Sequence, residues 1–115
     1  MSMQWELERT GDIGVMRLSG FLGAGVVHRF TGAVDWTGTR CPGAVVVDLA
    51  ALRGWSGDGE AAIVNAAGRL GPDRGPLAVC GLGERAAPLL VTARGLGLLR
   101  LFPDTDTALA ALAPH

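Results

Sequence analysis

A run of aliphatic residues in the middle of the chain constrains its fold more than any other feature. Residues 45–49 are Val-Val-Val-Asp-Leu, which is typical of a strand buried on both faces of a sheet. A polar turn containing glycine follows, and then an alanine-rich segment, 61–70, with helical periodicity. These segments predict half of a strand–helix–strand unit. The loop of such a unit lies at the carboxyl edge of the sheet, beside the free N–H groups of a helix start, and we expect any functional site there.

The rest of the chain alternates between strand and helix patterns. Two strands and a short helix ending near Trp36 are predicted before the central strand. The full set of predicted elements is strands at 4–9, 15–18, 45–52, 77–80 and 98–102, and helices at 26–36, 61–70, 84–93 and 106–113. The order β-β-α-β-α-β-α-β-α predicts a single α/β domain, 1–115, with a mixed, mostly parallel sheet whose opening pair is antiparallel and lies at the edge.

Within the central helix, the apolar residues recur at a spacing of three and four. The stripe consists of Ala62, Ile63, Ala66, Ala67 and Leu70, and it predicts a helix that packs closely on the sheet. Glu60, Asn65 and Arg69 fall off this stripe. Gly71 is expected to end the helix as a C-cap.

Charge and composition exclude several classes of partner. The chain has 10 basic and 11 acidic residues, for a net charge of −1, so it lacks the positive excess that binds nucleic acid or an anionic membrane. Its apolar runs are shorter than the roughly 20 residues of a membrane span, and its start does not resemble a signal peptide. We therefore expect a protein of the cytoplasm that does not insert into membranes.

The cysteines and histidines do not form a metal-binding pattern. Cys41 and Cys80 are far apart, without a CxxC motif, and are interpreted as small buried hydrophobic residues. His28 and His115 are isolated from them and from each other. We predict neither a metal site nor a cofactor nor a catalytic triad.

The loop 55–60, Trp-Ser-Gly-Asp-Gly-Glu, is the candidate site. Gly57 and Gly59 suit a phosphate cradle, but the chain has no lysine, and Asp58 and Glu60 would repel an anion. The two carboxylates would make a catalytic pair only with a partner that the neighbouring sequence does not offer. We therefore predict protein–protein contact through this loop and the exposed face of the following helix. Trp55 is either a lid on the sheet edge or, if exposed, an interface anchor.

Three segments occur in an order and spacing that is similar to a known family. They are Ser-Gly-Phe-Leu at 19–22, the strand 45–52 leading into Ser-Gly-Asp-Gly at 56–59, and Leu-Leu-Arg-Leu-Phe-Pro at 98–103. In these segments the chain resembles the STAS domain, the family of sulfate transporters and anti-sigma factor antagonists. The resemblance covers about 5–112, and single-domain chains of this size resemble bacterial anti-sigma factor antagonists. It implies the STAS fold, with four or five strands and about four helices.

The resemblance also implies a role in partner switching. Such an antagonist binds an anti-sigma factor that is also a serine kinase, of the histidine-kinase-like ATPase type, and its phosphorylation ends the binding. The family pattern at the loop is Asp-Ser-Ser/Thr-Gly-Leu, with the phosphate accepted by a hydroxyl at the helix start. In this register Ser56 stands at the Asp, Gly57 and Asp58 at the hydroxyl positions, Gly59 at the Gly and Glu60 at the Leu.

The chain departs from this pattern in both loops. Asp58 stands at the phosphoacceptor position, and the family's Gly-Glu-Leu-Asp is replaced at 20–23 by Gly-Phe-Leu-Gly, which has no acid. A phosphoserine carries a charge between −1 and −2, and Asp58 carries a permanent −1. On one hypothesis, Asp58 partly imitates the modified state.

Three alternatives stay open at this point. Asp58 or Ser56 is an N-cap that stabilises the helix by about 0.5–2 kcal/mol and has no signalling role. Ser56 is an alternative phosphoacceptor in the same loop. The chain is an accessory or scaffold STAS subunit of a transport or stress-signalling complex, with the switch abandoned.

Overall fold

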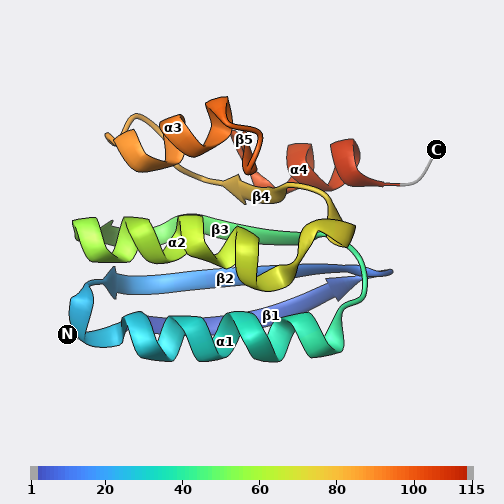
Figure 1. The fold of residues 1–115 in the computed structure, drawn as a ribbon, viewed down its shortest axis with the longest axis horizontal. Coiled ribbons are helices and arrows are strands. Elements are labelled where there is room, and N and C mark those ends of the chain that lie inside the picture. The colour runs from blue at the N-terminus through green and yellow to red at the C-terminus, as the bar shows by residue number, and fades with distance from the viewer. Residues whose placement is uncertain (1–2, 114–115) are drawn as a thin grey trace.

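The strands and helices follow one another in the predicted order (Figure 1). The structure, a computed structural model, describes residues 3–113, apart from the side chain of Pro72. Its strands are β1 (Met3–Thr10), β2 (Ile13–Leu22), β3 (Val45–Trp55), β4 (Leu77–Cys80) and β5 (Leu99–Phe102). Its α-helices are α1 (Val27–Arg40), α2 (Gly57–Leu70), α3 (Pro88–Gly95) and α4 (Thr105–Leu112), and short 3-10 turns occur at η1 (Ala24–Val26) and η2 (Pro72–Arg74).

The five strands form one sheet in the order β1-β2-β3-β4-β5. β1 pairs antiparallel with β2, and all other pairs are parallel. This confirms the predicted mixed sheet with an antiparallel edge strand. Because β2 and β3 are parallel, both end at one edge of the sheet, where Figure 1 shows α1 and α2 beginning.

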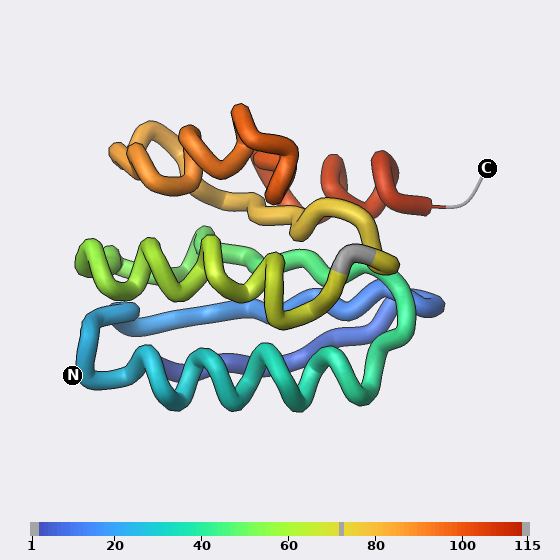
Figure 2. Tube along the Cα trace, viewed as in Figure 1, coloured from blue at the N-terminus to red at the C-terminus, as the bar shows by residue number. Residues whose placement is uncertain are grey.

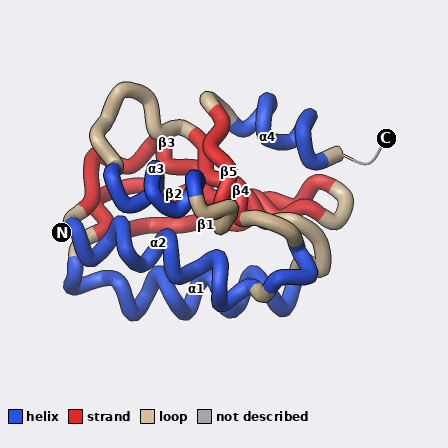
Figure 3. The backbone as a smooth tube through the Cα atoms, turned by 45° about the horizontal axis from the view of Figure 1, so that its top comes forward, coloured by secondary structure: helices blue, strands red, loops and turns tan. Residues whose placement is uncertain are grey.

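The helices cover both faces of the sheet, and the alternation of strand residues sets which face each one covers. Val45, Val47 and Leu49 pack into the larger core with residues of α1, α2 and α3. Val46 points the other way, into a smaller core with Ala108 of α4. Figure 3 shows the sheet between α4 and the pair α1 and α2, and Figure 2 shows that pair running side by side.

β2 and β3 extend further than their sequence patterns predict. β2 continues through the segment expected to be a glycine-rich loop as far as Leu22, and β3 continues as far as Trp55. Their pairing shifts register twice, between Arg17 and Ser19 and again between Gly20 and Phe21. Next to the first shift, Asp48 Oδ1 accepts a hydrogen bond from the Ala50 N–H at 2.9 Å, in place of a ladder partner.

α1 is longer than predicted, because distant residues complete its last turn. It ends at Arg40 and not near Trp36, and Thr37 is fully buried. The guanidinium of Arg74, in η2, donates to the carbonyl oxygens of Gly38 and Cys41 just where the helix ends. These bonds satisfy C-terminal carbonyls that the local sequence leaves without partners.

α3 and α4 also differ at their boundaries from the predicted helices. α3 begins at Pro88 instead of 84, with the proline at the first helical position, where a missing N–H costs nothing. α4 begins at Thr105, because the Asp104 side chain caps it by accepting the Thr107 N–H at 2.7 Å. Gly71, with φ of 90°, ends α2 as predicted.

Both cysteines are buried and free, as predicted. Cys80, at the end of β4, has its Sγ 3.4 Å from the Thr105 hydroxyl, and the Thr105 hydroxyl in turn donates to Asp48 Oδ2. Burial raises the pKa of the Cys80 thiol to about 11. His115 lies outside the described residues.

Candidate functional site

The loop between β3 and α2 lies at the carboxyl edge of the sheet, where the strand–helix pattern predicts it. The Ser56 N–H donates to the carbonyl oxygen of Leu22, at the end of β2, at 3.0 Å. This bond joins the loop to the neighbouring strand. The ends of β2 and β3 and the start of α2 therefore form one local unit.

Ser56 is the N-cap of α2. Its backbone is extended, and its Oγ accepts a hydrogen bond from the Gly59 N–H at 3.2 Å. The sequence left open whether Ser56 or Asp58 has this role, and the structure assigns it to Ser56. As an alternative phosphoacceptor, the Ser56 hydroxyl is half-buried and already engaged with the helix.

Gly59 allows the first turn of α2 to approach the end of β2 closely. A Cβ at this position would lie 2.0 Å from the carbonyl oxygen of Leu22, far inside contact distance. At Gly57, two residues earlier, a Cβ would meet nothing within 4 Å. Backbone packing therefore demands glycine at 59 and not at 57.

Asp58 is exposed at the second position of α2. Among the described residues it has no hydrogen-bond or ion-pair partner. It lines a hollow of about 330 Å³ beside α2, together with Val27, Ala61 and Asn65. A carboxylate in the first turn is favoured by the helix dipole and remains accessible to an approaching molecule.

Glu60 does not lie on the solvent side of α2, where the sequence pattern put it. It is only 5 % exposed, and its Oε2 accepts hydrogen bonds from the backbone N–H groups of Leu89 at 2.8 Å and Leu90 at 3.1 Å. These are the first N–H groups that α3 offers, since its first residue is Pro88. Glu60 is therefore a cap supplied by one helix to another. The sequence carries one signal of this contact. Ala86-Ala87-Pro88 offers α3 no capping side chain of its own, so the first N–H groups of α3 need an acceptor from elsewhere in the chain.

Trp55 is half-buried and is covered by Arg85, whose guanidinium carbon lies 4.7 Å from the ring centroid. The same guanidinium donates to the carbonyl oxygens of Leu49 at 2.9 Å and Leu52 at 2.6 Å, on β3. β4 pairs with β3 only as far as Asp48. Arg85 thus takes the place of the missing strand beyond that point. The sequence pattern did not single out Arg85, because its partners are 33 and 36 residues away.

The accessible part of the candidate loop is shorter than predicted. Gly57 and Asp58 are exposed and Trp55 and Ser56 are half-buried, whereas Gly59 and Glu60 are buried. In the other loop of the resemblance, Phe21 lies against Gly54, where a Cβ would be 3.2 Å from its ring. Residues 20–22 there form the end of β2.

Residues 3–113 contain neither a metal-binding cluster nor a membrane-spanning helix. No group of three or more His, Cys, Asp or Glu residues among residues 3–113 is arranged to hold a metal ion. In the same part of the chain, no helix combines the length and apolar character needed to cross a membrane.

Comparison with solved structures identifies this fold. An anti-sigma factor antagonist from Mycobacterium paratuberculosis superposes with a TM-score of 0.78 at 22 % identity, over 96 % of this chain and 94 % of that one. The phosphorylated form of the Bacillus cell fate determinant SpoIIAA gives 0.67 at 15 % identity, over 96 % and 100 %. A STAS-domain antagonist from Rhodobacter sphaeroides gives 0.62 at 19 % identity, over 73 % and 91 %.

These similarities show that the chain has the fold of STAS-domain anti-sigma factor antagonists, as the sequence resemblance implied. No protein-family model matches the chain, and no curated protein matches it.

Proposed function

We propose that this protein is an anti-sigma factor antagonist-like binding module in which a fixed carboxylate, Asp58, replaces the modifiable hydroxyl. The observation that carries the proposal is the exposed, unpartnered Asp58 in the first turn of α2, at the carboxyl edge of a STAS-type sheet. The partner is an anti-sigma factor of the serine-kinase type. This partner would contact the outer side of α2 and the surface formed by Trp55, Ser56, Gly57 and Asp58. Because such a partner is a cytoplasmic protein, the proposal also implies that this chain acts in the cytoplasm.

The chemistry of Asp58 determines what becomes of the switch. A carboxylate has two oxygens and one charge, whereas a phosphoserine has three terminal oxygens and nearly twice the charge. Asp58 therefore removes the acceptor hydroxyl without reproducing the modified state in full. The proposal is that binding persists and is no longer controlled by phosphorylation at this position.

The loop is assigned binding and no catalysis. A catalytic carboxylate pair would need both Asp58 and Glu60 to face a substrate. The Glu60 carboxylate is instead buried and occupied by two N–H groups of α3. Only one of the two carboxylates is left for chemistry at the surface, which supports a binding role.

Incubation with a purified histidine-kinase-like anti-sigma factor and ATP tests the proposal, with binding read by pull-down and phosphate by intact mass. The wild type is expected to bind and to gain no phosphate, and Asp58→Ser to gain one. Asp58→Ser/Ser56→Ala serves as the matched control, because phosphate must persist there if position 58 is the acceptor. Failure of the wild type to bind would contradict the proposal. Binding without any modification of Asp58→Ser would instead favour the accessory-subunit alternative.

A further inference from the structure

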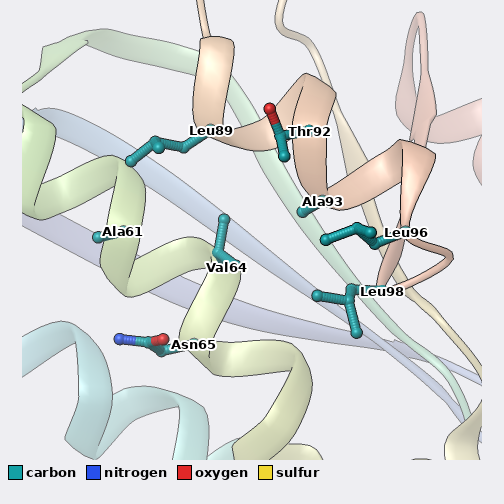
Figure 4. A pocket seen from close by; sticks show the side chains of 8 residues that line it. All are labelled: Ala61, Val64, Asn65, Leu89, Thr92, Ala93, Leu96 and Leu98. Atoms are coloured by element: carbon teal, nitrogen blue, oxygen red, sulfur yellow. The ribbon is translucent and has the colours of Figure 1, made fainter.

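An apolar groove runs between α2 and α3 (Figure 4). It has a volume of about 210 Å³, and Figure 4 shows side chains of α2 facing those of α3 and of the turn that follows it. Its lining includes Ala61, Val64, Asn65, Leu89, Leu96 and Leu98. None of its lining residues carries a charge.

The groove accounts for most of the large apolar side chains that the described residues expose. Leu96 is 72 % exposed, Leu98 46 % and Leu89 42 %. Among the described residues, only Val91 and Trp36 are large hydrophobic residues of comparable exposure. Four of these five side chains lie within ten residues, on α3 and its following turn. Such clustering, as opposed to scattered single residues, marks an interaction surface.

The groove is continuous with the candidate loop at one end. The hollow that contains Asp58 shares Ala61 and Asn65 with the groove. At the other end, Leu98 is shared with a third hollow that reaches Gly71. Three adjoining hollows therefore follow the outer side of α2 from Asp58 to Gly71, over about 20 Å at 1.5 Å per residue, and together they are called the channel. Of the described residues that line its three parts, Asp58 alone is charged.

We propose that this channel binds the apolar face of a partner helix that places a basic residue against Asp58. The proposal rests on the proposed function, whose partner would supply the helix. A channel of this length holds about three to four helical turns, with aliphatic anchors at i, i+4 and i+7. The single acid at its loop end fixes both the sign of the charge on the partner and the direction in which the helix lies.

Two other occupants fit the structure less well. Small-molecule pockets enclose most of their ligand, whereas this groove is open to solvent. In a symmetric dimer the same concave surface would meet itself and leave the groove unfilled. The described residues that line the channel include no basic side chain. The channel of a second copy would therefore offer Asp58 no cationic partner.

Glu60 holds the two walls of the groove together. Its carboxylate, on α2, binds the N–H of Leu89, which is itself a lining residue on α3. Glu60 is thus a positioning residue for this surface and would not contact the partner, because it is buried.

The test is a methyl NMR titration of the full chain with three synthetic 14-residue peptides. One has leucines at i, i+4, i+7 and i+11 in an alanine–arginine background, the second replaces arginine by glutamate, and the third is a scrambled form of the first. The arginine peptide is expected to shift the methyl signals of Leu89, Leu96 and Leu98 and to bind about tenfold more tightly than the other two. Equal binding of the three peptides, or shifts located elsewhere, would overturn the proposal. So would concentration-dependent dimerisation that shifts the same methyl signals without any peptide.

Matched variants locate the site and separate it from the proposed function. Leu96→Ser is expected to weaken binding of the arginine peptide about fivefold, and Asp58→Asn to abolish the preference for arginine over glutamate. Val91→Ser, an exposed position on α3 that lies outside the lining, should leave binding unchanged. If an anti-sigma factor binds the wild type and Leu96→Ser/Leu98→Ser equally, the groove proposal fails and the proposed function stands. If the peptide results hold but no anti-sigma factor binds, the proposed function fails alone.

Discussion

The carboxylate of Glu60 accepts a hydrogen bond from the backbone N–H of Leu89 at 2.8 Å, so the first turn of α2 caps the start of α3. Ala87, at the N-cap of α3, provides no side-chain hydrogen bond. This contact ties the candidate loop to the helix that forms the other wall of the apolar groove. The loop and the groove are therefore parts of one connected surface.

Truncation of Glu60 tests how much its hydrogen bonds to α3 contribute to the stability of the fold. Glu60→Ala is expected to lower the free energy of unfolding by about 2–3 kcal/mol, because it leaves the buried N–H group of Leu90 and the partly buried one of Leu89 without a charged acceptor. Glu60→Gln, which keeps one acceptor oxygen, should cost about half as much. Urea denaturation measures both, with Glu84→Ala, an exposed acid before α3, as the control. Equal stabilities of Glu60→Ala and Glu84→Ala would refute the capping role.

The two glycines at the start of α2 are expected to respond oppositely to the same substitution. Gly59→Ala should destabilise the fold by about 3 kcal/mol, because the new methyl group would press on the Leu22 carbonyl, which is backbone and cannot move aside. Gly57→Ala has open space and should be neutral or stabilise by up to about 1 kcal/mol by restricting the unfolded chain. Thermal melts of both variants provide the comparison, and similar melting temperatures would show that α2 does not approach β2 so closely.

Arg85 is expected to hold the end of β3 in place. Arg85→Lys should destabilise the protein by about 1–3 kcal/mol, because an ammonium group cannot serve the carbonyls of Leu49, Leu52 and Gly81 and also cover Trp55. Hydrogen exchange should rise at residues 49–55. Arg94→Lys, an exposed substitution on α3, is the control. Unchanged exchange at 49–55 in Arg85→Lys would contradict the proposed role.

The raised pKa of Cys80 predicts a loss of stability at alkaline pH. In the native state burial keeps the thiol protonated until about pH 11, whereas in the unfolded chain it ionises near 9. The stability that the protonated Cys80 thiol contributes to the native state is therefore fully present below pH 9 and is lost as the pH rises towards 11. The melting temperature of the wild type should fall more steeply across this range than that of Cys80→Ala. Cys41→Ala retains Cys80 and should follow the wild type, and parallel curves for all three proteins would rule out this effect.

Local sequence patterns were sufficient for the order of elements and the sheet. Three consecutive valines in β3 specify a strand covered on both faces, and the spacing of Ala62, Ile63 and Ala66 specifies the buried side of α2. Both signals are contained within a few residues, so they can be recognised without knowledge of the partner segments.

The features that the sequence did not reveal depend on contacts between distant residues. Glu60 is buried because N–H groups 29 and 30 residues further on need an acceptor. α1 reaches Arg40 because the Arg74 guanidinium donates hydrogen bonds to carbonyl oxygens at the end of this helix. Likewise, the groove exists only because α3 packs beside α2. For the candidate loop, the patterns located its position at the sheet edge. They did not show that α2 begins at Gly57 and not at 61, or which of the loop side chains face solvent.

Isothermal titration calorimetry with a purified histidine-kinase-like anti-sigma factor measures whether the surface around Asp58 binds this class of partner. The wild type is expected to bind with an affinity that prior incubation with ATP does not change. Asp58→Arg should weaken binding about tenfold or more, and Glu84→Arg, which makes the same charge change outside the loop, should change it by less than about twofold. If Asp58→Arg binds as tightly as Glu84→Arg, or if the wild type does not bind, the surface around Asp58 does not have the proposed binding role.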